Sequence, residues 1–552
     1  MNSAPSGFHG PFFTDFPTRA AYSEGAGPYR IVPLAVAVPG DLDDLRRLVN
    51  HAAEHGVALT PRGAGSGIPG NNVGPGVVVD MRLFRSPLTV SDEGVGNAGA
   101  AVTWADLNRA AGEKGFRIGP NPSSGHACTI GGMVATNAAG ARSVRTGSVR
   151  KWIRGVEMVT ADGEIGWFGR EGTRRKRRTP TPGQERSHNP LLAMPRRFDV
   201  GAGLAIGDST AEVRARFPKT AKNSSGYALD QFLQTNELLD LIIGSEGTLG
   251  IVTRVEMTLE PLPKSVSSVL LALPDLGSLA DIVGELRTLD PGAIELMDRT
   301  LLSIAAPKLP FSVTGIEAVL LVDFERGAAE EAGDAAERAR TQLSDRCVRF
   351  ETALTEDERD QLWKVRHAAS PMLAALPANR RSLQVIEDGC VPVAMLGRYL
   401  EGVRAVGKKA GVEVVAFGHA GDGHLHVNAL ADTDEPGFAD RLATLLADVT
   451  ALLVELGGTA SGEHGDGRLR APVLERVYGR KVMDLFAAVK HSFDPEGIMN
   501  PGVILPVAGR SSLANLKVGA DAEAIPEDVE QQLRIVERSG EWNVAKNELV
   551  AR

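Results

Sequence analysis

The apolar residues near the start of the chain change between helical and strand spacing. Residues 41–56 carry leucine, valine and alanine three and four positions apart and end in glycine, which predicts an amphipathic helix with a glycine cap. Residues 57–63 and 76–81 have the apolar character of short strands. The glycine-rich stretch between them therefore connects two predicted strands.

A second pattern begins near residue 266, after two prolines in 260–265 that indicate a domain boundary. Apolar runs at 268–274 and 318–325 predict strands, and residues 327–345 and 396–411 predict amphipathic helices. Residues 412–431 predict a hairpin, since two alternating runs flank a glycine turn.

Two segments show no apolar periodicity. Residues 170–190 are polar and basic, which predicts a solvated loop, and residues after about 509 are charged with no clear core pattern. Either segment is a candidate for docking a partner protein or, for the basic loop, an anionic membrane surface.

Composition narrows the class of protein. The 552 residues are 43% apolar and 23% charged, with a net charge of −9, which is typical of a globular protein and argues against nucleic-acid binding. No apolar run is long enough for a transmembrane span, and the first residues lack the layout of a signal peptide. We therefore expect a cytoplasmic protein, with peripheral association at the inner face of the membrane as the alternative.

The three cysteines lie far apart and form no C-x-x-C pair. This spacing argues against a disulfide framework, a cysteine zinc site and an iron–sulfur cluster within the chain.

Three glycine-rich segments, 62–76, 123–149 and 244–259, suggest a phosphate-binding surface, because glycine lets backbone amides approach phosphate oxygens. Gly63 and Gly65 begin a G-x-G-x-x-G pattern, but Ile68 occupies its third glycine position. A strand rather than a helix also follows this loop, so a Rossmann fold is excluded. The nucleotide interpretation requires a different architecture.

The segment 418–428 places three of the eleven histidines close together. His424, His426 and Asn428 alternate along a strand and share one face, and the turn before them can bring His419 back toward His426. Glu463, in the segment 461–467, can complete a site of two imidazoles and one carboxylate. Such a set leaves open positions on a divalent ion, as catalytic sites do; zinc is the first expectation, with manganese and ferrous iron as alternatives.

Six motifs occur in the order found in one flavoprotein family: "PRGAGSGIPG", "NPSSGHACTIGGMVATNAAGARSVRTGSV", "GSEGTLGIVTRVEMTLEPLP", "GHAGDGHLHVN", "GEHGDG" and "DPEGIMNPG". Over residues 20 to 506 the chain resembles FAD-linked D-2-hydroxyacid dehydrogenases of the vanillyl-alcohol-oxidase (PCMH-type) superfamily. The resemblance implies an α+β fold, with a PCMH-type FAD-binding domain and a FAD-linked oxidase C-terminal substrate domain built on an antiparallel sheet. The expected parts are an arm at 1–29, the FAD domain at 30–262, the substrate domain at 263–460, a segment returning to the FAD domain at 461–508, and a charged tail at 509–552.

The resemblance also implies FAD contacts. The first loop would hold the pyrophosphate, and Ser66 stands where relatives with covalent flavin carry histidine, so non-covalent FAD is expected. The implied contacts are Arg62, Gly63, Ala64, Gly65, Ser66, Gly67, Asn71, Pro122, Ser123, Thr129, Gly132, Asn137, Gly140, Glu246, Gly247, Gly250, Ile251 and Asn500.

Roles in substrate binding follow from the same resemblance. His419, His426 and Glu463 match the family's metal ligands, and His464 matches its catalytic base. Asn428 lies beside the substrate, Arg366 matches an arginine that binds the substrate carboxylate, and Ser370 one turn later is expected in the same pocket. His424 departs from the pattern, because most relatives have asparagine there.

The implied reaction oxidises a D-2-hydroxyacid to the 2-oxoacid: the metal polarises the hydroxyl group, His464 takes its proton, and hydride passes to flavin N5. Ile386 or Glu387 replaces a lysine that relatives use for a distal carboxylate, which argues against D-2-hydroxyglutarate; D-lactate is the preferred substrate, with glycolate as a further possibility. Arg380, Arg381 and Lys222 are candidates to compensate for that lysine.

With no cysteine cluster, the electrons must pass to a separate acceptor: an iron–sulfur protein, a quinone, a cytochrome or an electron-transfer flavoprotein. An oxygen-using oxidase on the same fold, a metal-dependent hydrolase and a non-catalytic subunit are the alternatives. The hydrolase leaves the glycine loops unexplained, and the retained ligands, base and arginine argue against the non-catalytic subunit.

Overall fold

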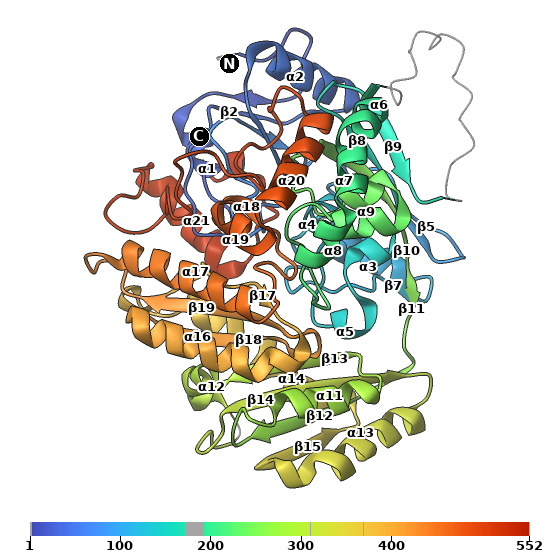
Figure 1. Ribbon diagram of the computed structural model, residues 1–552, viewed down its shortest axis with the longest axis vertical. Coiled ribbons are helices and arrows are strands. Elements are labelled where there is room, and N and C mark those ends of the chain that lie inside the picture. The colour runs from blue at the N-terminus through green and yellow to red at the C-terminus, as the bar shows by residue number, and fades with distance from the viewer. Residues whose placement is uncertain (1–2, 172–192, 310, 368, 551–552) are drawn as a thin grey trace.

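The computed structural model of the protein describes residues 3–171, 193–309, 311–367 and 369–550. Figure 1 shows two halves: the upper one combines the N-terminal part of the chain with its last segments, and the lower one is built from residues between β11 and α17. Most of the basic 170–190 loop, from residue 172 onward, lies outside the described residues.

The upper half begins with a small four-stranded sheet in which β4 pairs in parallel with both β2 and β3. Helix α2 (Leu42–His55) covers it, and its ends follow from the sequence, since the Asp41 side chain accepts from the backbone N–H of Asp44 and Gly56 adopts a left-handed conformation. The predicted helix is confirmed, and so are the two predicted strands on either side of the first glycine-rich stretch. In spatial order the strands are β1 (Phe12–Phe13), β2 (Ala35–Ala37), β4 (Val77–Asp80) and β3 (Leu59–Arg62).

A second, five-stranded antiparallel sheet supports the other two glycine-rich loops. Its strands in spatial order are β5 (Leu88–Val90), β6 (Val95–Gly99), β10 (Ile251–Thr258), β8 (Ile153–Val159) and β9 (Ile165–Gly169), and a short pair joins β7 (Phe116–Arg117) to β11 (Glu260–Pro261). The helices around these sheets are α1 (Phe16–Ala21), α3 (Trp104–Gly112), α4 (Ile130–Thr136), α5 (Ser143–Thr146), α6 (Ala193–Phe198), α7 (Leu204–Asp208), α8 (Thr210–Arg216), α9 (Leu229–Thr235), α10 (Leu238–Ile242), α18 (Gly467–Arg470), α19 (Leu474–Tyr478) and α20 (Arg480–Phe493).

The lower half is a large sheet whose strand pairs are all antiparallel among the described residues, as the sequence predicted. Its strands in spatial order are β15 (Arg349–Ala353), β12 (Ser265–Leu273), β14 (Ala318–Arg326), β13 (Ala293–Asp298), β18 (Glu413–His419), β19 (His424–Ala431) and β16 (Arg381–Leu383), with β17 (Gly389–Cys390) pairing β19. The hairpin predicted at 412–431 is the β18–β19 pair.

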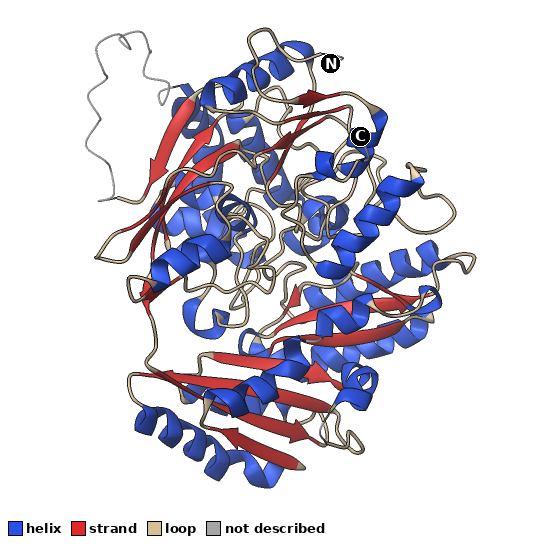
Figure 2. Ribbon diagram, turned by 180° about the vertical axis from the view of Figure 1, so that it is seen from behind, coloured by secondary structure: helices blue, strands red, loops and turns tan. Residues whose placement is uncertain are grey.

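Helices cover both faces of this sheet, because its central strands are apolar on both sides (Figure 2). Along β12, Val269 and Leu271 face one layer and Leu270 and Ala272 the other. The first layer contains α11 (Leu279–Thr288), α13 (Ala329–Leu343), α16 (Leu396–Ala410) and α17 (Phe438–Glu455), and the second contains α12 (Arg299–Ala305), α14 (Glu356–His367) and α15 (Ala369–Ala374).

After the large sheet the chain returns to the upper half. Leu474, Phe486 and Phe493 join the core that surrounds the five-stranded sheet. The two halves also meet through Arg117, whose guanidinium group donates to Glu260 at 2.7 Å and to Glu325 of β14 at 2.7 Å. The return of the chain places residues 461–467 between the halves.

The segment after residue 509 differs from the charged tail expected from the sequence. Its helix α21 (Glu527–Ser539) buries Val529, Leu533 and Val536, and the first two pack against α1. Val529 and Leu533 carry this contact, and the sequence alone does not show that the apolar face of this helix has a partner. Figure 1 shows α21 near α1, beside the N-terminal part of the chain.

Within the described residues, no helix combines the length and the apolar character needed to cross a bilayer.

Candidate active site

One cavity is lined by all three glycine-rich loops and also by Glu463 and His464. Most of the residues predicted to contact FAD line it: Arg62, Gly63, Ala64, Gly65, Ser66, Gly67, Asn71, Pro122, Ser123, Thr129, Gly132, Glu246, Gly247, Gly250 and Ile251. Loops far apart in sequence therefore converge on one space, which the sequence could suggest only through their shared composition.

The first loop needs its glycines because the backbone is packed closely. Gly65 has φ +83°, and a Cβ there would lie 2.4 Å from Nη2 of Arg62. A Cβ on Gly63 would lie 2.5 Å from Oγ1 of Thr129. The buried Arg62 guanidinium donates to the carbonyl oxygens of Tyr22 (3.1 Å) and Glu24 (2.8 Å), so it braces the loop against the N-terminal arm.

Three predicted cofactor contacts lie off the cavity lining. Asn137 is the left-handed C-cap of α4 and donates to Ser224. Gly140 packs so closely on Asn121 that a Cβ would lie 2.3 Å from the Asn121 carbonyl oxygen. The Asn500 side-chain amide donates to the backbone of Asn71 and Glu246. For these three the observed contacts are with the loops themselves, and their contact with FAD stays a prediction.

Glu246 ties the loops to the segment that carries Glu463. Its carboxyl group accepts from the Asn71 side chain (2.9 Å) and from the backbone N–H groups of Asp466 (2.8 Å) and Gly467 (3.0 Å). Burial, followed by repulsion from Asp466, raises the pKa of Glu246 to about 8. Its side chain thus joins the cavity lining to the Glu463 segment through hydrogen bonds.

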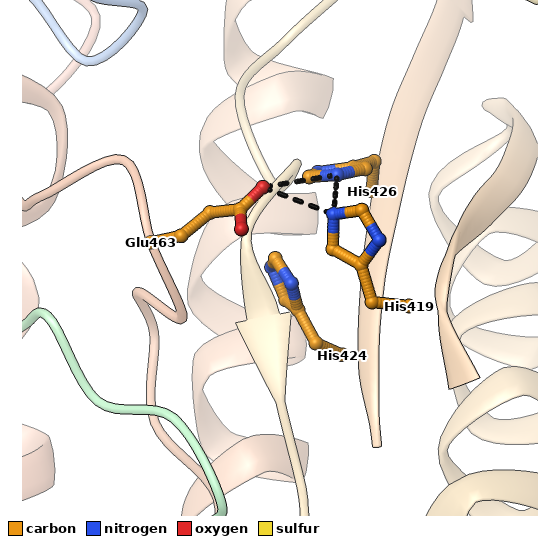
Figure 3. A group of neighbouring side chains, drawn as sticks. All are labelled: His419, His424, His426 and Glu463. Carbon is orange, nitrogen blue, oxygen red and sulfur yellow. Dashed lines mark hydrogen bonds and ion pairs between the residues drawn. The ribbon is translucent and has the colours of Figure 1, made fainter. Parts of the chain in front are cut away.

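The predicted metal ligands converge (Figure 3). The Nε2 atoms of His419 and His426 lie 3.2 and 3.4 Å from Oε1 of Glu463 and 3.3 Å from each other. Ligands held at about 2.1 Å by a tetrahedral ion are about 3.4 Å apart, so these spacings suit one ion. His424 belongs to the same group, in which one ligand atom from each residue lies within 4.8 Å of the others.

Glu295 of β13 fixes His419. Its carboxylate lies 2.5 Å from Nδ1 of His419 and accepts from Nε of Arg366 at 2.7 Å. Burial alone raises the pKa of Glu295, but the charges of His419 and Arg366 outweigh it and lower the pKa to about 2. The carboxylate–histidine pair leaves Nε2 of His419 directed at Glu463, an arrangement typical of metal-binding histidines.

Lys222 holds the other oxygen of Glu463. It is buried, and its ammonium group donates to Oε2 of Glu463 (3.1 Å) and to Ser143 (3.0 Å). Burial opposes ionisation of Glu463, yet the charges of Lys222 and His419 keep its pKa well below the usual range. Glu463 therefore presents Oε1 to the histidines as a carboxylate.

His464 lies beside this cluster. Its Nδ1 lies 2.6 Å from Oε2 of Glu387, and Oε1 of Glu387 accepts from Arg470 at 2.5 Å. Burial lowers the pKa of His464, but the charges of Glu387 and Asp388 raise it well above the usual range. With Nδ1 engaged by Glu387, Nε2 is directed toward the cluster and lies 3.4 Å from Oε1 of Glu463.

Two predicted substrate contacts come from neighbouring elements. Asn428 on β19 shares the strand face of His424 and His426 and donates to Ser382 at 3.0 Å. The Arg366 guanidinium lies 5.0 Å from the ring centre of Phe417. Ser370 belongs to α15, and its side chain lies outside the described part of the chain.

Residues 33–169 match the family described as "FAD binding domain", and residues 262–504 match "FAD linked oxidases, C-terminal domain". The chain is an FAD-linked oxidoreductase. It carries the predicted pair of domains, so the expected PCMH-type α+β fold is confirmed.

Several known proteins are similar to this FAD-linked oxidoreductase over most of its length. It is 28% identical to "Glycolate oxidase subunit GlcD" of Bacillus subtilis over 88% of this chain and 92% of the relative. It is also 28% identical to "D-lactate dehydrogenase" of Archaeoglobus fulgidus over 89% and 96% of the two chains. The solved structure titled "4-ethylphenol oxidase from Gulosibacter chungangensis: isoeugenol complex" shares the fold, with a TM-score of 0.61 and 17% identity over 89% of this chain and 93% of that chain.

Several residues that hold the site together were not predicted from the sequence. Glu295 was not identified, although a lone carboxylate within an apolar strand is a recognisable signal of a buried partner. Asp388 follows Glu387 inside another apolar run, a similar signal. Lys222 and Glu387 were considered only for substrate choice, because their ion pairs join segments far apart in sequence.

Proposed function

We propose that this FAD-linked oxidoreductase oxidises a small D-2-hydroxyacid, preferably D-lactate, to the 2-oxoacid with non-covalent FAD and a divalent metal ion. The observation that carries the proposal is the cavity that includes both the glycine-rich loops and the Glu463–His464 segment. The names of the relatives, glycolate oxidase subunit and D-lactate dehydrogenase, support the same substrate class.

The residues fit both groups. His419, His426 and Glu463 offer two imidazoles and a carboxylate at ion-compatible spacing, a set suited to zinc, manganese or ferrous iron. When bound, the ion would polarise the substrate hydroxyl group and FAD would accept the hydride. The packing around Gly63 and Gly65 leaves no room for a Cβ at either position, so their backbone amides stay open to a pyrophosphate. No histidine stands in the first loop for covalent attachment of the flavin.

The chain's own residues would then orient the substrate and move one proton. The Arg366 guanidinium is fixed by Glu295 and suits a carboxylate. His464, held at Nδ1 by Glu387, would take the hydroxyl proton on Nε2. Asn428 faces the same space from β19.

Charges near the site favour a substrate with one carboxylate. Ile386 is buried and apolar, and Glu387 already pairs with His464 and Arg470. Of the cations that could compensate, Lys222 pairs with Glu463 and Arg380 with the exposed Glu413. Arg381 is the remaining candidate for a distal carboxylate, so Arg381→Ala should leave D-lactate oxidation unchanged.

The test is anaerobic bleaching of the bound flavin by a panel of D- and L-hydroxyacids, before and after treatment with a chelator. We expect bleaching by D-lactate that is lost on chelation while the flavin stays bound. Bleaching by L-isomers alone, or bleaching that survives complete metal removal, would overturn the proposal.

An oxygen-using oxidase remains the alternative reaction on this fold. Peroxide formed in equal amount to the substrate consumed in air would favour it. The hydrolase alternative predicts a colourless protein, against the match of residues 33–169 to an FAD-binding domain. Electron transfer to a separate acceptor predicts little peroxide and fast reoxidation by an artificial quinone or dye.

A further inference from the structure

His424 has no role in the proposed reaction, although it lies in the metal-ligand group. The ring is fully buried at the start of β19, with its centre 4.8 Å from that of His426 and 5.4 Å from that of His419. In Figure 3 it lies beside the Glu463 carboxylate and the His419 ring. We propose that Nδ1 of His424 is a further protein ligand of the ion, which gives three imidazoles and one carboxylate; this inference rests on the proposed function.

The hydrogen bonds of the ring leave Nδ1 for this task. Nε2 lies 2.8 Å from Oδ1 of Asp388. The Asp388 carboxylate also accepts from Ser461 Oγ (2.6 Å) and from the backbone N–H of His464 (2.9 Å), so it acts as an acceptor throughout. Nε2 of His424 must therefore carry the proton that it donates to Asp388.

Nδ1 then carries a lone pair that has no hydrogen-bond partner among the described residues. A buried polar atom without a partner costs about 1–3 kcal/mol, and such atoms are rare in folded proteins. A carboxylate that holds one ring nitrogen while the other faces a cluster of ligands is the pattern of a metal-binding histidine. A purely structural role for His424 would leave Nδ1 unexplained.

The backbone around the ring is shaped to let it approach. A Cβ on Gly462 would lie 2.6 Å from Cδ2 and 2.8 Å from Nε2 of His424, so only glycine leaves room for the imidazole under the chain that carries Glu463. His424 and Glu463 are thereby brought close enough for one ligand atom of each to lie within 4.8 Å. Two ligands on opposite sides of one ion with bonds of about 2.1 Å lie about 4.2 Å apart, a spacing within this limit.

Three imidazoles and one carboxylate change what the site binds. Imidazole nitrogen suits zinc and ferrous iron better than magnesium or calcium, so we expect a tightly held transition-metal ion. Four protein ligands also leave fewer open positions, and a chelating hydroxyacid would have to raise the coordination number or displace His424.

The test measures zinc release and coordination instead of turnover. Both proteins carry His55→Asn, because His51, Glu54 and His55 form a second group near the surface that could take up zinc. One of them also carries His424→Asn, and the other keeps His424. Zinc-loaded, FAD-containing protein is mixed with excess chelator. We expect the His424→Asn protein to release zinc at least about tenfold faster, with flavin content unchanged.

If the His424 variant folds poorly, a crystal structure of the zinc-loaded His55→Asn protein decides the case. The zinc ion is located in it by anomalous scattering. Zinc within about 2.1 Å of Nδ1 of His424 supports the inference. Zinc bound to His419, His426 and Glu463 with His424 beyond bonding distance, or equal release rates, overturns it and leaves the proposed function intact. Failure of the parent protein to bind zinc, manganese or ferrous iron would instead overturn the proposed function.

Discussion

Replacing Glu295 by glutamine should destabilise the lower half of the molecule strongly. Glu295 is completely buried between His419 and Arg366, with contacts of 2.5 and 2.7 Å. Glutamine keeps the shape of the side chain and removes its charge, so Arg366 and His419 lose their ionic partner inside the protein.

The magnitude follows from the carboxyl group itself. Although burial opposes ionisation, the charges of His419 and Arg366 lower the pKa of Glu295 from 4.5 to about 2. At roughly 1.4 kcal/mol for each tenfold change in proton affinity, this difference stabilises the folded state by about 3 kcal/mol. Because the folded pKa is the lower one, the contribution is complete above pH 4.5 and is lost as the pH falls from 4.5 toward 2.

The assay is calorimetric unfolding of chelator-treated protein at neutral pH and at acid pH. A loss of about 3 kcal/mol lowers the melting temperature of a domain of about 200 residues by roughly 6–12 °C. Glu413→Gln is the matched control: its ion pair with Arg380 is exposed and should contribute less than about 1 kcal/mol. Equal melting temperatures for the two variants, or a Glu295→Gln deficit that does not shrink toward low pH, would refute the reasoning.

Three further predictions test other parts of the molecule. Gly65→Ala should yield protein without flavin, because a Cβ at φ +83° would lie 2.4 Å from a guanidinium nitrogen; Gly112→Ala, where a Cβ meets open space, should keep its flavin colour. Leu533→Ala should cost about 2–5 kcal/mol and weaken FAD retention, measured by melting and by flavin released on dilution, because Leu533 is fully buried between α21 and α1; unchanged values would show that α21 is dispensable. Glu387→Gln should lower the pKa of His464 and shift the rising limb of the bleaching rate to lower pH, since the carboxylate charge favours protonated His464; an unshifted limb would argue against His464 as the base.

The fold was predictable wherever local pattern and packing agree. The helix at 41–56 carries both of its caps in sequence, and the hairpin at 412–431 carries its turn, so both appear as expected. Helix α21 was missed because its apolar residues are few and acquire meaning only against α1. Local periodicity does not reveal which distant surface an amphipathic helix will cover.

The candidate site shows the same division. His419 and His426 could be brought together from the sequence, because a strand alternation and a turn set their relation. Glu295 and Lys222 could not, since they reach the cluster from other strands and loops through ion pairs across long sequence separations. Asn137, Gly140 and Asn500 are predicted cofactor contacts, and the structure adds hydrogen bonds and close packing through which they support the loops.

The contact between the N-terminal arm and α21 sets an order of events during synthesis. Arg62 of the first glycine-rich loop donates to the backbone of Glu24, and the Glu24 side chain pairs with Arg534, which is translated 510 residues later. At about 5–20 residues per second, this interval on the ribosome lasts roughly 25–100 seconds. The first glycine-rich loop is thus fully braced only after Arg534 has been synthesised, so its final support depends on a residue made much later than the loop itself.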